Sequence, residues 1–390
     1  MSFVGVTAQG RRIVYRDHKR YLWLFSPALL AVPFVTIGIY FWTGGAAVAT
    51  LIPFVFIFGF IPLMDAILGE DFNNPPPEVV AAMDADPYYS RIAWATVPLY
   101  WSSYLAMAAF VGTQHLPWWS WAALVLGVGT LNGGCIVLGH ELGHKPDWVN
   151  RVFALLANNV VGYGHFRVEH NRGHHTWAST PEDPASARYG ESIYRFAGRE
   201  LPGAFRRGWC CEAERLKRSG KKVWSIENEI LQGYALALAV AGALIAAFGW
   251  ILLPFILAHH FIGWYALTQA NYVEHYGLLR QKRANGRYEP VAPRHSWNTN
   301  HIFSNLLTFH LQRHSDHHAN PMRPYQSLRD FKDLPRLPSG YPGVFVLAAI
   351  PPLWFRVMNP KVLAWAGGDL SKVNVDPRMR QSATAATQAA

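Results

Sequence analysis

Four long tracts of the chain contain no charged residue, and these tracts predict helices that cross a membrane. They cover residues 21–42, 44–64, 92–139 and 230–273. A helix of about 20 apolar residues is long enough to cross the roughly 30 Å hydrocarbon core of a bilayer. The fourth tract would be about 66 Å long as one helix. It must therefore fold back on itself, near residues 249–254.

The third tract is interrupted by Gln114-His115-Leu116-Pro117 and therefore holds two helices. The predicted fold class is an all-α integral membrane protein, with residues 1–380 as a single domain. Residues 381–390 contain only Gln, Ser, Ala and Thr and are expected to be a disordered tail. Six transmembrane helices are expected, at about 21–42, 44–68, 92–114, 118–139, 230–250 and 254–273, with a cap formed by 140–229 and 274–380.

The positive charges indicate which side of the membrane the cap occupies. All 35 Lys and Arg residues lie outside the predicted spans. With six spans, the segments that carry them face the same side, and the positive-inside rule makes that side the cytoplasm. We therefore expect a multi-pass protein of the cell inner membrane with both termini in the cytoplasm. The apolar stretch after Arg11-Arg12 is longer than the roughly 7–15-residue core of a cleaved signal peptide, so it is expected to remain as the first span.

The composition excludes several classes of protein. Hydrophobic residues make up 51% of the chain and charged residues 15%, whereas soluble proteins have about 25% charged residues. The net charge is +10. The basic residues responsible flank the predicted spans, where anionic lipid headgroups would attract them, so no nucleic acid partner is expected. Three cysteines without a C-x-x-C pair exclude a disulfide framework and metal sites of the C-x-x-C type.

Histidines cluster in four places on the predicted cytoplasmic side. The clusters are His140-Glu141-Leu142-Gly143-His144, His170-Asn171-Arg172-Gly173-His174-His175, Glu274-His275 and His314-Ser315-Asp316-His317-His318. Residues three or four apart lie on one face of a helix, with Cβ atoms about 5–6 Å apart, so one metal ion can bind both imidazoles. This pattern predicts a metal site. Imidazole binds Zn, Cu, Fe and Ni, so the spacing alone does not identify the metal.

Three other interpretations of these clusters explain less of the sequence. His140 to His144 matches the H-E-x-x-H motif of zinc proteases, but such a site would leave two clusters unused. Carboxylate di-iron proteins use two E-x-x-H pairs, and Glu141–His144 is the only such pair at a histidine cluster. A metal transporter would need ionisable residues within its spans, and the predicted spans contain little beyond Asp65, His259 and His260.

The chain resembles the membrane-bound di-iron desaturases and hydroxylases, and within them the bacterial alkane 1-monooxygenases. The residues that carry this resemblance are His140–Lys145, Glu169–His175, Asn271–Leu278 and Leu311–His318, together with Gly69–Pro76 and His295–His301. The last two histidine clusters separate the alkane hydroxylases from the desaturases.

The resemblance implies the site and the reaction. Two iron ions would be held by nine ligands: His140, His144, His170, His174, His175, His275, His314, His317 and His318. The implied reaction is the hydroxylation of n-alkanes by O2 to 1-alkanols, on the cytoplasmic side of the membrane. The chain has no dinucleotide-binding or haem-attachment motif. Electrons are therefore expected from an external donor, and the resemblance implies that this donor is rubredoxin with an NADH-dependent rubredoxin reductase. Hydroxylation of alkylbenzenes, desaturation of fatty acyl chains and a non-redox zinc protein remain as alternatives.

Several neighbouring residues are expected to support the ligands. Glu141, Glu169, Glu274 and Asp316 adjoin ligand histidines and are predicted to orient their rings, as metal-bound imidazoles usually require. His165, His295, His301 and His310 are predicted to hold ligand rings or nearby backbone, and His259 and His260 to be hydrogen-bonded in the core.

Two further groups of residues are predicted to bind substrate and partner. Asp65, near the cytoplasmic end of the second span, should face the interior of the bundle. Ile61 and Ile57 share its helical stripe and are predicted to line an alkane channel, with Ile57 further from the irons. A basic run in the cap could bind either anionic lipid or an acidic electron carrier; it comprises Arg206, Arg207, Arg215, Lys217, Arg218, Lys221 and Lys222.

Overall fold

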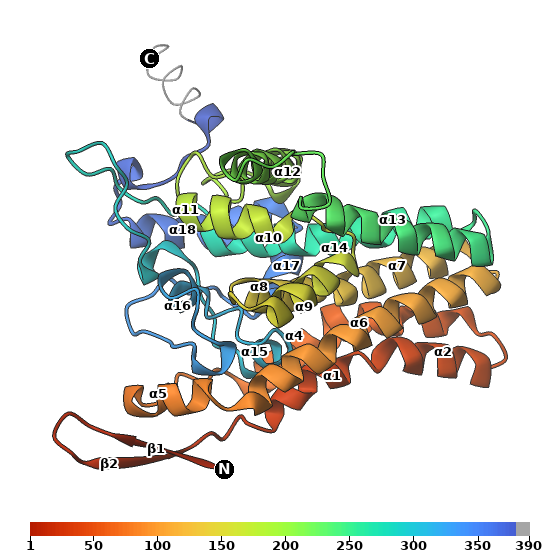
Figure 1. The fold of residues 1–390 in the computed structure, drawn as a ribbon, viewed down its shortest axis with the longest axis horizontal. Coiled ribbons are helices and arrows are strands. Elements are labelled where there is room, and N and C mark those ends of the chain that lie inside the picture. The colour runs from red at the N-terminus through yellow and green to blue at the C-terminus, as the bar shows by residue number, and fades with distance from the viewer. Residues whose placement is uncertain (380–390) are drawn as a thin grey trace.

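A computed structural model describes residues 1–379, so the predicted tail at 381–390 lies outside the described residues. The fold is predominantly helical (Figure 1). The long helices lie beside one another and reach a common end of the molecule, whereas short helices and loops form the other end. The helices of the apolar tracts are α1 Phe25–Leu29, α2 Val32–Trp42, α3 Ile52–Val55, α4 Ile61–Leu68, α6 Pro87–Thr113, α7 Trp118–Gly133, α8 Cys135–Gly143, α13 Glu229–Phe248 and α14 Leu252–His275.

The predicted breaks between helices are confirmed. Helix α2 ends at Trp42, and Gly44 and Gly45 follow with positive φ angles of 69° and 91°. Helices α6 and α7 are separated by residues 114–117. The fourth tract folds back at Gly249, which has a φ of 85°, a conformation that glycine adopts at little cost.

Within residues 1–379, three helical stretches are long and apolar enough to cross a membrane: Ala47–Leu68, Trp118–Gly143 and Glu229–Phe248. The number rises to five if two bent pairs each form one span. These are Leu22–Leu29 with Val32–Trp42, bent by 50°, and Tyr341–Ala348 with Pro351–Trp365, bent by 116°. Helices α6 and α14 cover two other predicted spans, but they do not meet the same test. Six spans therefore remain a prediction.

Two features were not predicted. The bent pair of α17 (Tyr341–Ala348) and α18 (Pro351–Trp365) was missed because Arg356 and Lys361 interrupt its apolar pattern. The all-α class is also incomplete, because β1 (Ser2–Val6) and β2 (Arg12–Arg16) form an antiparallel hairpin. An isolated hairpin is marginally stable. This one packs β1 against α5 (Pro77–Asp84), a contact between distant segments that the local sequence does not reveal.

Close packing of α7 against α14 sets the position of the site. A Cβ atom at Gly129 would lie 2.8 Å from the side chain of Ile262, and one at Gly133 would lie 3.1 Å from the Cα of Gly263. Small residues at a helix interface let the two backbones approach each other. Helix α8 continues directly from α7, and residues of α8 and of the end of α14 line the same cavity.

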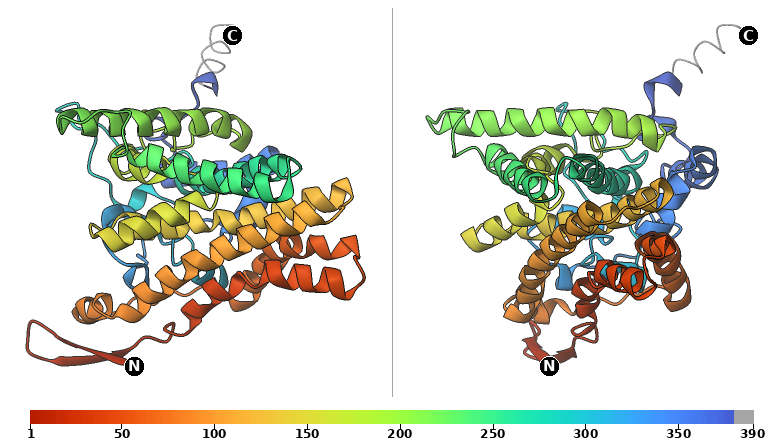
Figure 2. Two further views of the ribbon diagram at one scale, coloured as in Figure 1. Left: turned by 45° about the vertical axis from the view of Figure 1, so that its right-hand side comes forward. Right: turned by 90° about the vertical axis from the view of Figure 1, so that its right-hand side faces the viewer.

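Most of the remaining helices lie in the segments predicted to form the cap, 140–229 and 274–380. Figure 2 shows α12 as the long helix that crosses over the others. The cap helices are α9 Trp148–Asn159, α10 Phe166–Glu169, α11 His175–Trp177, α12 Ile193–Arg218, α15 Ile302–Leu307, α16 His314–Ala319, α17 and α18.

The arrangement of the long helices predicts the sidedness of their connections. In Figure 1 the connections after α2, between α6 and α7, and between α13 and α14 lie at the same end of the molecule, opposite α11 and α16. Variants Thr43→Cys, His115→Cys and Trp250→Cys should react with a membrane-impermeant maleimide in intact spheroplasts. The native Cys210 is exposed on α12 and should react only after permeabilisation. Labelling of Cys210 in intact spheroplasts would contradict this topology.

Candidate metal centre

Four helical segments bring histidines to one region of the protein. Helix α8 carries His140, and His144 caps its end. A π-helical turn at His170–His174 leads into α11, which begins with His175. Helix α14 ends at His275, and α16 carries the last cluster.

The nine predicted histidines form two groups. One contains His140, His144, His170, His175 and His317, and the other contains His174, His275, His314 and His318. In each group the candidate ligand nitrogens lie within 4.8 Å of one another. The Nε2 atoms of His170 and His175 are 3.0 Å apart, and those of His314 and His318 are 2.9 Å apart. Two ion-sized sites are therefore surrounded by imidazole nitrogens.

The π-helical turn determines which histidines share a group. The backbone N–H of His175 bonds to the carbonyl of His170, five residues earlier, so these two rings lie on one face. His174 faces the other group. In an α-helix, His170 and His174 would lie on one face, but the π-helical turn is wider and separates them. Such turns are rare and often occur at functional sites.

The chemistry of the two groups fits metal ions. The Nε2 atoms of His140, His144, His174 and His275 are buried without a hydrogen-bond partner. Burial lowers the pKa of His144 to about 3, and burial together with neighbouring imidazoles holds the pKa values of His170 and His317 well below 6.5. Neutral imidazole is the form that binds metal. Converging lone pairs in a buried space are favourable only around a cation.

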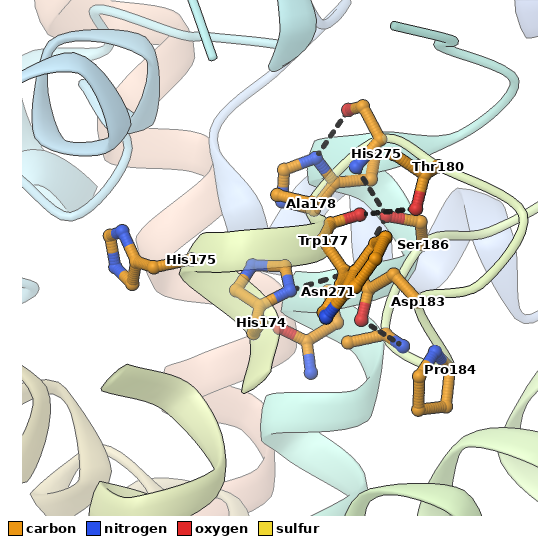
Figure 3. Close-up of polar contacts among 12 residues, drawn as sticks. His174, His175, Trp177, Ala178, Thr180, Asp183, Pro184, Ser186, Asn271 and His275 are labelled. Carbon is orange, nitrogen blue, oxygen red and sulfur yellow. Dashed lines mark hydrogen bonds and ion pairs between the residues drawn. The ribbon is translucent and has the colours of Figure 1, made fainter. Parts of the chain in front are cut away.

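Asp183 holds one of these rings and was not predicted. Its Oδ2 atom lies 2.9 Å from Nδ1 of His174 (Figure 3). Ser186 donates to the same carboxylate at 2.7 Å, and Arg207 lies 2.8 Å from it. Burial alone would raise the pKa of Asp183, but His174 and Arg207 lower it far below its usual range. Asp183 therefore remains ionised and orients His174.

His275 is held by a second unpredicted contact. Its Nδ1 atom lies 3.2 Å from Oγ of Ser179 and 3.2 Å from the carbonyl oxygen of His295. The predicted support from His295 therefore comes from its backbone. Ser179 has a φ of 56°, which is uncommon for a residue other than glycine. Neither Ser179 nor Asp183 stands at a fixed helical spacing from a histidine cluster, so the sequence contains no signal for them.

An apolar cavity adjoins both groups. Ile57 and Ile61 line it, as predicted for the channel. Its lining also includes His140 and His170 from the five-histidine group and His314 from the four-histidine group. The predicted channel residue Asp65 does not line this cavity. It is buried, and its Oδ1 atom accepts a hydrogen bond from the backbone N–H of Ser304 at 2.9 Å.

Comparison with known proteins identifies the family. The sequence matches the fatty acid desaturase family over residues 116–347, which include all nine histidines. It is 51% identical over 369 residues to an alkane 1-monooxygenase of Ectopseudomonas oleovorans, covering 94% of this chain and 92% of that protein. It is 49% identical over 368 residues to alkane 1-monooxygenase 1 of Alcanivorax borkumensis, covering 94% and 91%. The chain belongs to the alkane 1-monooxygenase family.

Membership of this family makes the protein a monooxygenase, an enzyme of the oxidoreductase class. A more distant relative is the xylene/toluene monooxygenase hydroxylase component of Pseudomonas putida. It is 30% identical over 246 residues, which cover 63% of this chain and 65% of that protein.

Of the four carboxylates predicted to orient ligand rings, only Glu274 contacts one. Its Oε2 atom lies 3.2 Å from Nε2 of His314, and Tyr341 donates a hydrogen bond to its Oε1. The prediction for the other three is wrong, since each pairs with a basic side chain. Glu141 lies 3.5 Å from Lys145, Glu169 accepts from Arg207 at 2.9 Å, and Asp316 lies 2.9 Å from Arg329. Residues adjacent in a helix do not face the same way, so each carboxylate points away from the ring beside it.

The other histidines lie outside the two groups. His310 lies 3.1 Å from the carbonyl oxygen of Tyr325. It therefore contacts backbone, one of the two roles predicted for it, and not a ligand ring. His165 lies 2.6 Å from the hydroxyl of Tyr234, and His301 lies 3.9 Å from Glu70. His259 lies 3.0 Å from Asn132 and 3.1 Å from His260, so these two histidines are hydrogen-bonded in the core as predicted.

The basic run separates into exposed and internal side chains. Arg206, Lys217, Arg218, Lys221 and Lys222 are exposed. Arg207 pairs with Glu169 and Asp183 and has a side chain only 15% exposed. It therefore supports the metal centre, and its predicted place in a docking surface is wrong. Arg215 is half-buried beside Glu212.

The bond between Asp183 and His174 predicts the effect of one substitution. Asp183→Asn removes the charge that orients His174 and should weaken metal binding to the four-histidine group by roughly 10–100-fold. Titration against a competing chelator measures this affinity. The exposed neighbour Glu182 bonds to Tyr288, so Glu182→Gln is the control and should bind metal normally. Equal affinity in the wild type and Asp183→Asn would show that Asp183 does not position the ligand.

Proposed function

We propose that the protein hydroxylates the terminal carbon of n-alkanes at a di-iron site held by nine histidines. The observation that carries this proposal is the junction of an apolar cavity with two groups of buried imidazoles. The five-histidine group would hold one iron ion and the four-histidine group the other. The relatives named alkane 1-monooxygenase support the substrate class.

The overall reaction consumes an alkane, O2, two electrons and two protons, and yields a 1-alkanol and water. When bound, the iron ions would supply the redox chemistry that activates O2 and cleaves a C–H bond. Imidazole ligands are compatible with iron, and the buried unpaired nitrogens require a cation. Among the metals that imidazole binds, the similarity to the membrane desaturase and hydroxylase family favours iron, which we assign to both groups.

The side chains around the cavity would position the substrate and exclude water. Ile57, Ile61 and Phe345 give the lining its apolar character, and His140 and His314 border the same space. An alkyl chain has no polar group to orient it, so only the shape of the cavity can select its end. Entry end-on would bring the terminal carbon to the histidines. A dry site also prevents side reactions with solvent.

The polar residues at this end would hold the ligands in place. Tyr341 donates a hydrogen bond to Oε1 of Glu274, whose Oε2 lies 3.2 Å from Nε2 of His314, so this carboxylate borders the ion site of the four-histidine group. Asp183 accepts from Nδ1 of His174, which leaves Nε2 of that ring free for metal. The contact with Asp183 fixes the orientation of His174 before any ion binds, which reduces the reorganisation that binding requires.

Electrons would arrive from rubredoxin, which its NADH-dependent reductase would reduce. An external donor is necessary because the sequence contains no dinucleotide-binding or haem-attachment motif. We place the histidine groups on the cytoplasmic side of the inner membrane, with six spans and both termini in the cytoplasm, because the basic residues lie with the cap. The exposed members of the basic run, Arg206, Lys217, Arg218, Lys221 and Lys222, would attract an acidic carrier.

The di-iron assignment predicts two irons per chain in active protein and equal importance of the two groups. His275→Ala should abolish alkane hydroxylation as thoroughly as His140→Ala, because the two residues belong to different groups. Metal analysis and octane turnover measure the two quantities. His115→Ala, in an exposed loop, is the control. One zinc per chain in active protein, or full turnover by His275→Ala, would refute the assignment.

The cavity lining predicts a change in chain-length selectivity. Ile57→Trp should shorten the longest alkane accepted and leave turnover of short alkanes unchanged, because the larger ring fills part of the cavity. A series of n-alkanes of increasing length tests this. Leu63→Trp is the control, since Leu63 lies on the adjoining helix and is 56% exposed. Uniform loss across all lengths would indicate a packing defect in place of a channel.

Charge reversal tests the docking surface. Changing Lys217, Arg218, Lys221 and Lys222 to Glu should raise the apparent KM for rubredoxin and flatten its dependence on salt, because electrostatic steering would be lost. Alkane affinity should not change. Reversal of Arg11, Arg12 and Arg16, exposed at the hairpin, is the control. Wild-type values of the rubredoxin KM and salt slope would identify the run as a lipid contact.

A further inference from the structure

A second pocket lies outside the metal centre and the apolar cavity. It is formed by α9, the turn that follows it, α10 and the first turn of α13. Its lining combines polar with apolar residues: Trp148, Arg151, Val152, Leu155, Asn158, Asn159, Gly164, Arg167, Val168, Glu229 and Gln232. It shares no residue with the cavity that adjoins the histidines.

Two arginines give this pocket an excess of positive charge. Arg151 lies 3.2 Å from one carboxylate oxygen of Glu229, and Arg167 pairs with the other. Each guanidinium has five N–H donors, and only one nitrogen of each contacts Glu229. The remaining donors can bind an anion, and planar guanidinium groups match the geometry of phosphate.

The pocket lies where a membrane would end. Glu229 is the first residue of α13, whose apolar stretch is only 17% buried within the protein. Trp148 is 75% exposed at the edge of the pocket, and Trp224 and Ile226, which precede α13, are 76% and 89% exposed. Exposed tryptophans are typical of the lipid headgroup level. The exposed face of α13, including Leu238, continues from the pocket along the direction that acyl chains would take.

The pocket also offers acceptors for a cation. Asn159 donates through Nδ2 to the carbonyl of Leu155, while its Oδ1 atom has no partner although the residue is only 1% exposed. A buried acceptor without a donor is costly. Glu229 provides a carboxylate, and the Trp148 ring provides a face that attracts ammonium groups. One pocket therefore contains groups that can bind an anion and groups that can bind a cation.

We propose that this pocket binds the headgroup of a phospholipid that carries a primary ammonium, as in phosphatidylethanolamine. Arg151 and Arg167 would bind the phosphate, and Glu229 and Asn159 would receive the ammonium. The acyl chains would lie against Val152 and the apolar face of α13. This site is separate from the hydroxylation reaction and does not depend on its substrate or metal.

Native mass spectrometry of the full-length protein tests this site. Protein stripped of lipid would be mixed with phosphatidylethanolamine, phosphatidylglycerol or phosphatidylcholine. The wild type should retain one phosphatidylethanolamine more strongly than the other two. Arg151→Gln should lower that retention about tenfold, the expected result of losing a charge-assisted hydrogen bond. Asn159→Leu should remove the preference over phosphatidylglycerol and preserve phospholipid binding. Arg356→Gln, on the exposed face of α18, is the control and should bind as the wild type does.

Three results would overturn the proposal. Wild-type retention by Arg151→Gln would show that the arginine pair does not bind phosphate. Equal or stronger retention of phosphatidylglycerol or phosphatidylcholine would refute the ammonium site. Displacement of the lipid by millimolar inorganic phosphate would identify a free-anion site. None of these readouts involves turnover, so they stand whether or not the alkane assignment holds.

Discussion

The structure depends on holding nine imidazoles together in a space from which water is largely excluded. Their lone pairs converge in two groups, an arrangement that is unfavourable until cations occupy it. The protein stabilises this arrangement by rigid packing elsewhere. Helix α14 lies against α7 at glycines, and the cap is fixed by ion pairs such as Arg207 with Glu169 and Asp183. The cap and the apolar helices thus form one support for the ligands.

Local patterns predicted the parts of the fold that depend on local chemistry. The charge-free tracts predicted the long helices, and glycines or prolines marked their ends. The hairpin at β1 and β2 and the bent pair α17 and α18 were missed because their stability comes from contacts between distant segments. The motifs predicted which histidines converge, although their binding of iron remains a prediction.

The grouping of the ligands and their supports could not be predicted from spacing. An α-helix would place His170 and His174 on one face, but a π-helical turn pairs His170 with His175. The carboxylates next to ligand histidines in sequence mostly point away from them. Asp183 and Ser179 instead reach His174 and His275 from a loop. Sequence neighbours on a helix face different ways, and a loop can bring any residue to a ring.

Two pairs of adjacent histidines are divided between the groups: His174 from His175, and His317 from His318. Consecutive Cα atoms are about 3.8 Å apart. A single peptide unit therefore joins a histidine of one group to a histidine of the other. An ion bound in one group therefore immobilises backbone that the other group also uses. The entropy lost in ordering that backbone is lost once for both sites. The shared backbone thus favours joint loading of the two proposed ions, whereas repulsion between neighbouring cations opposes it.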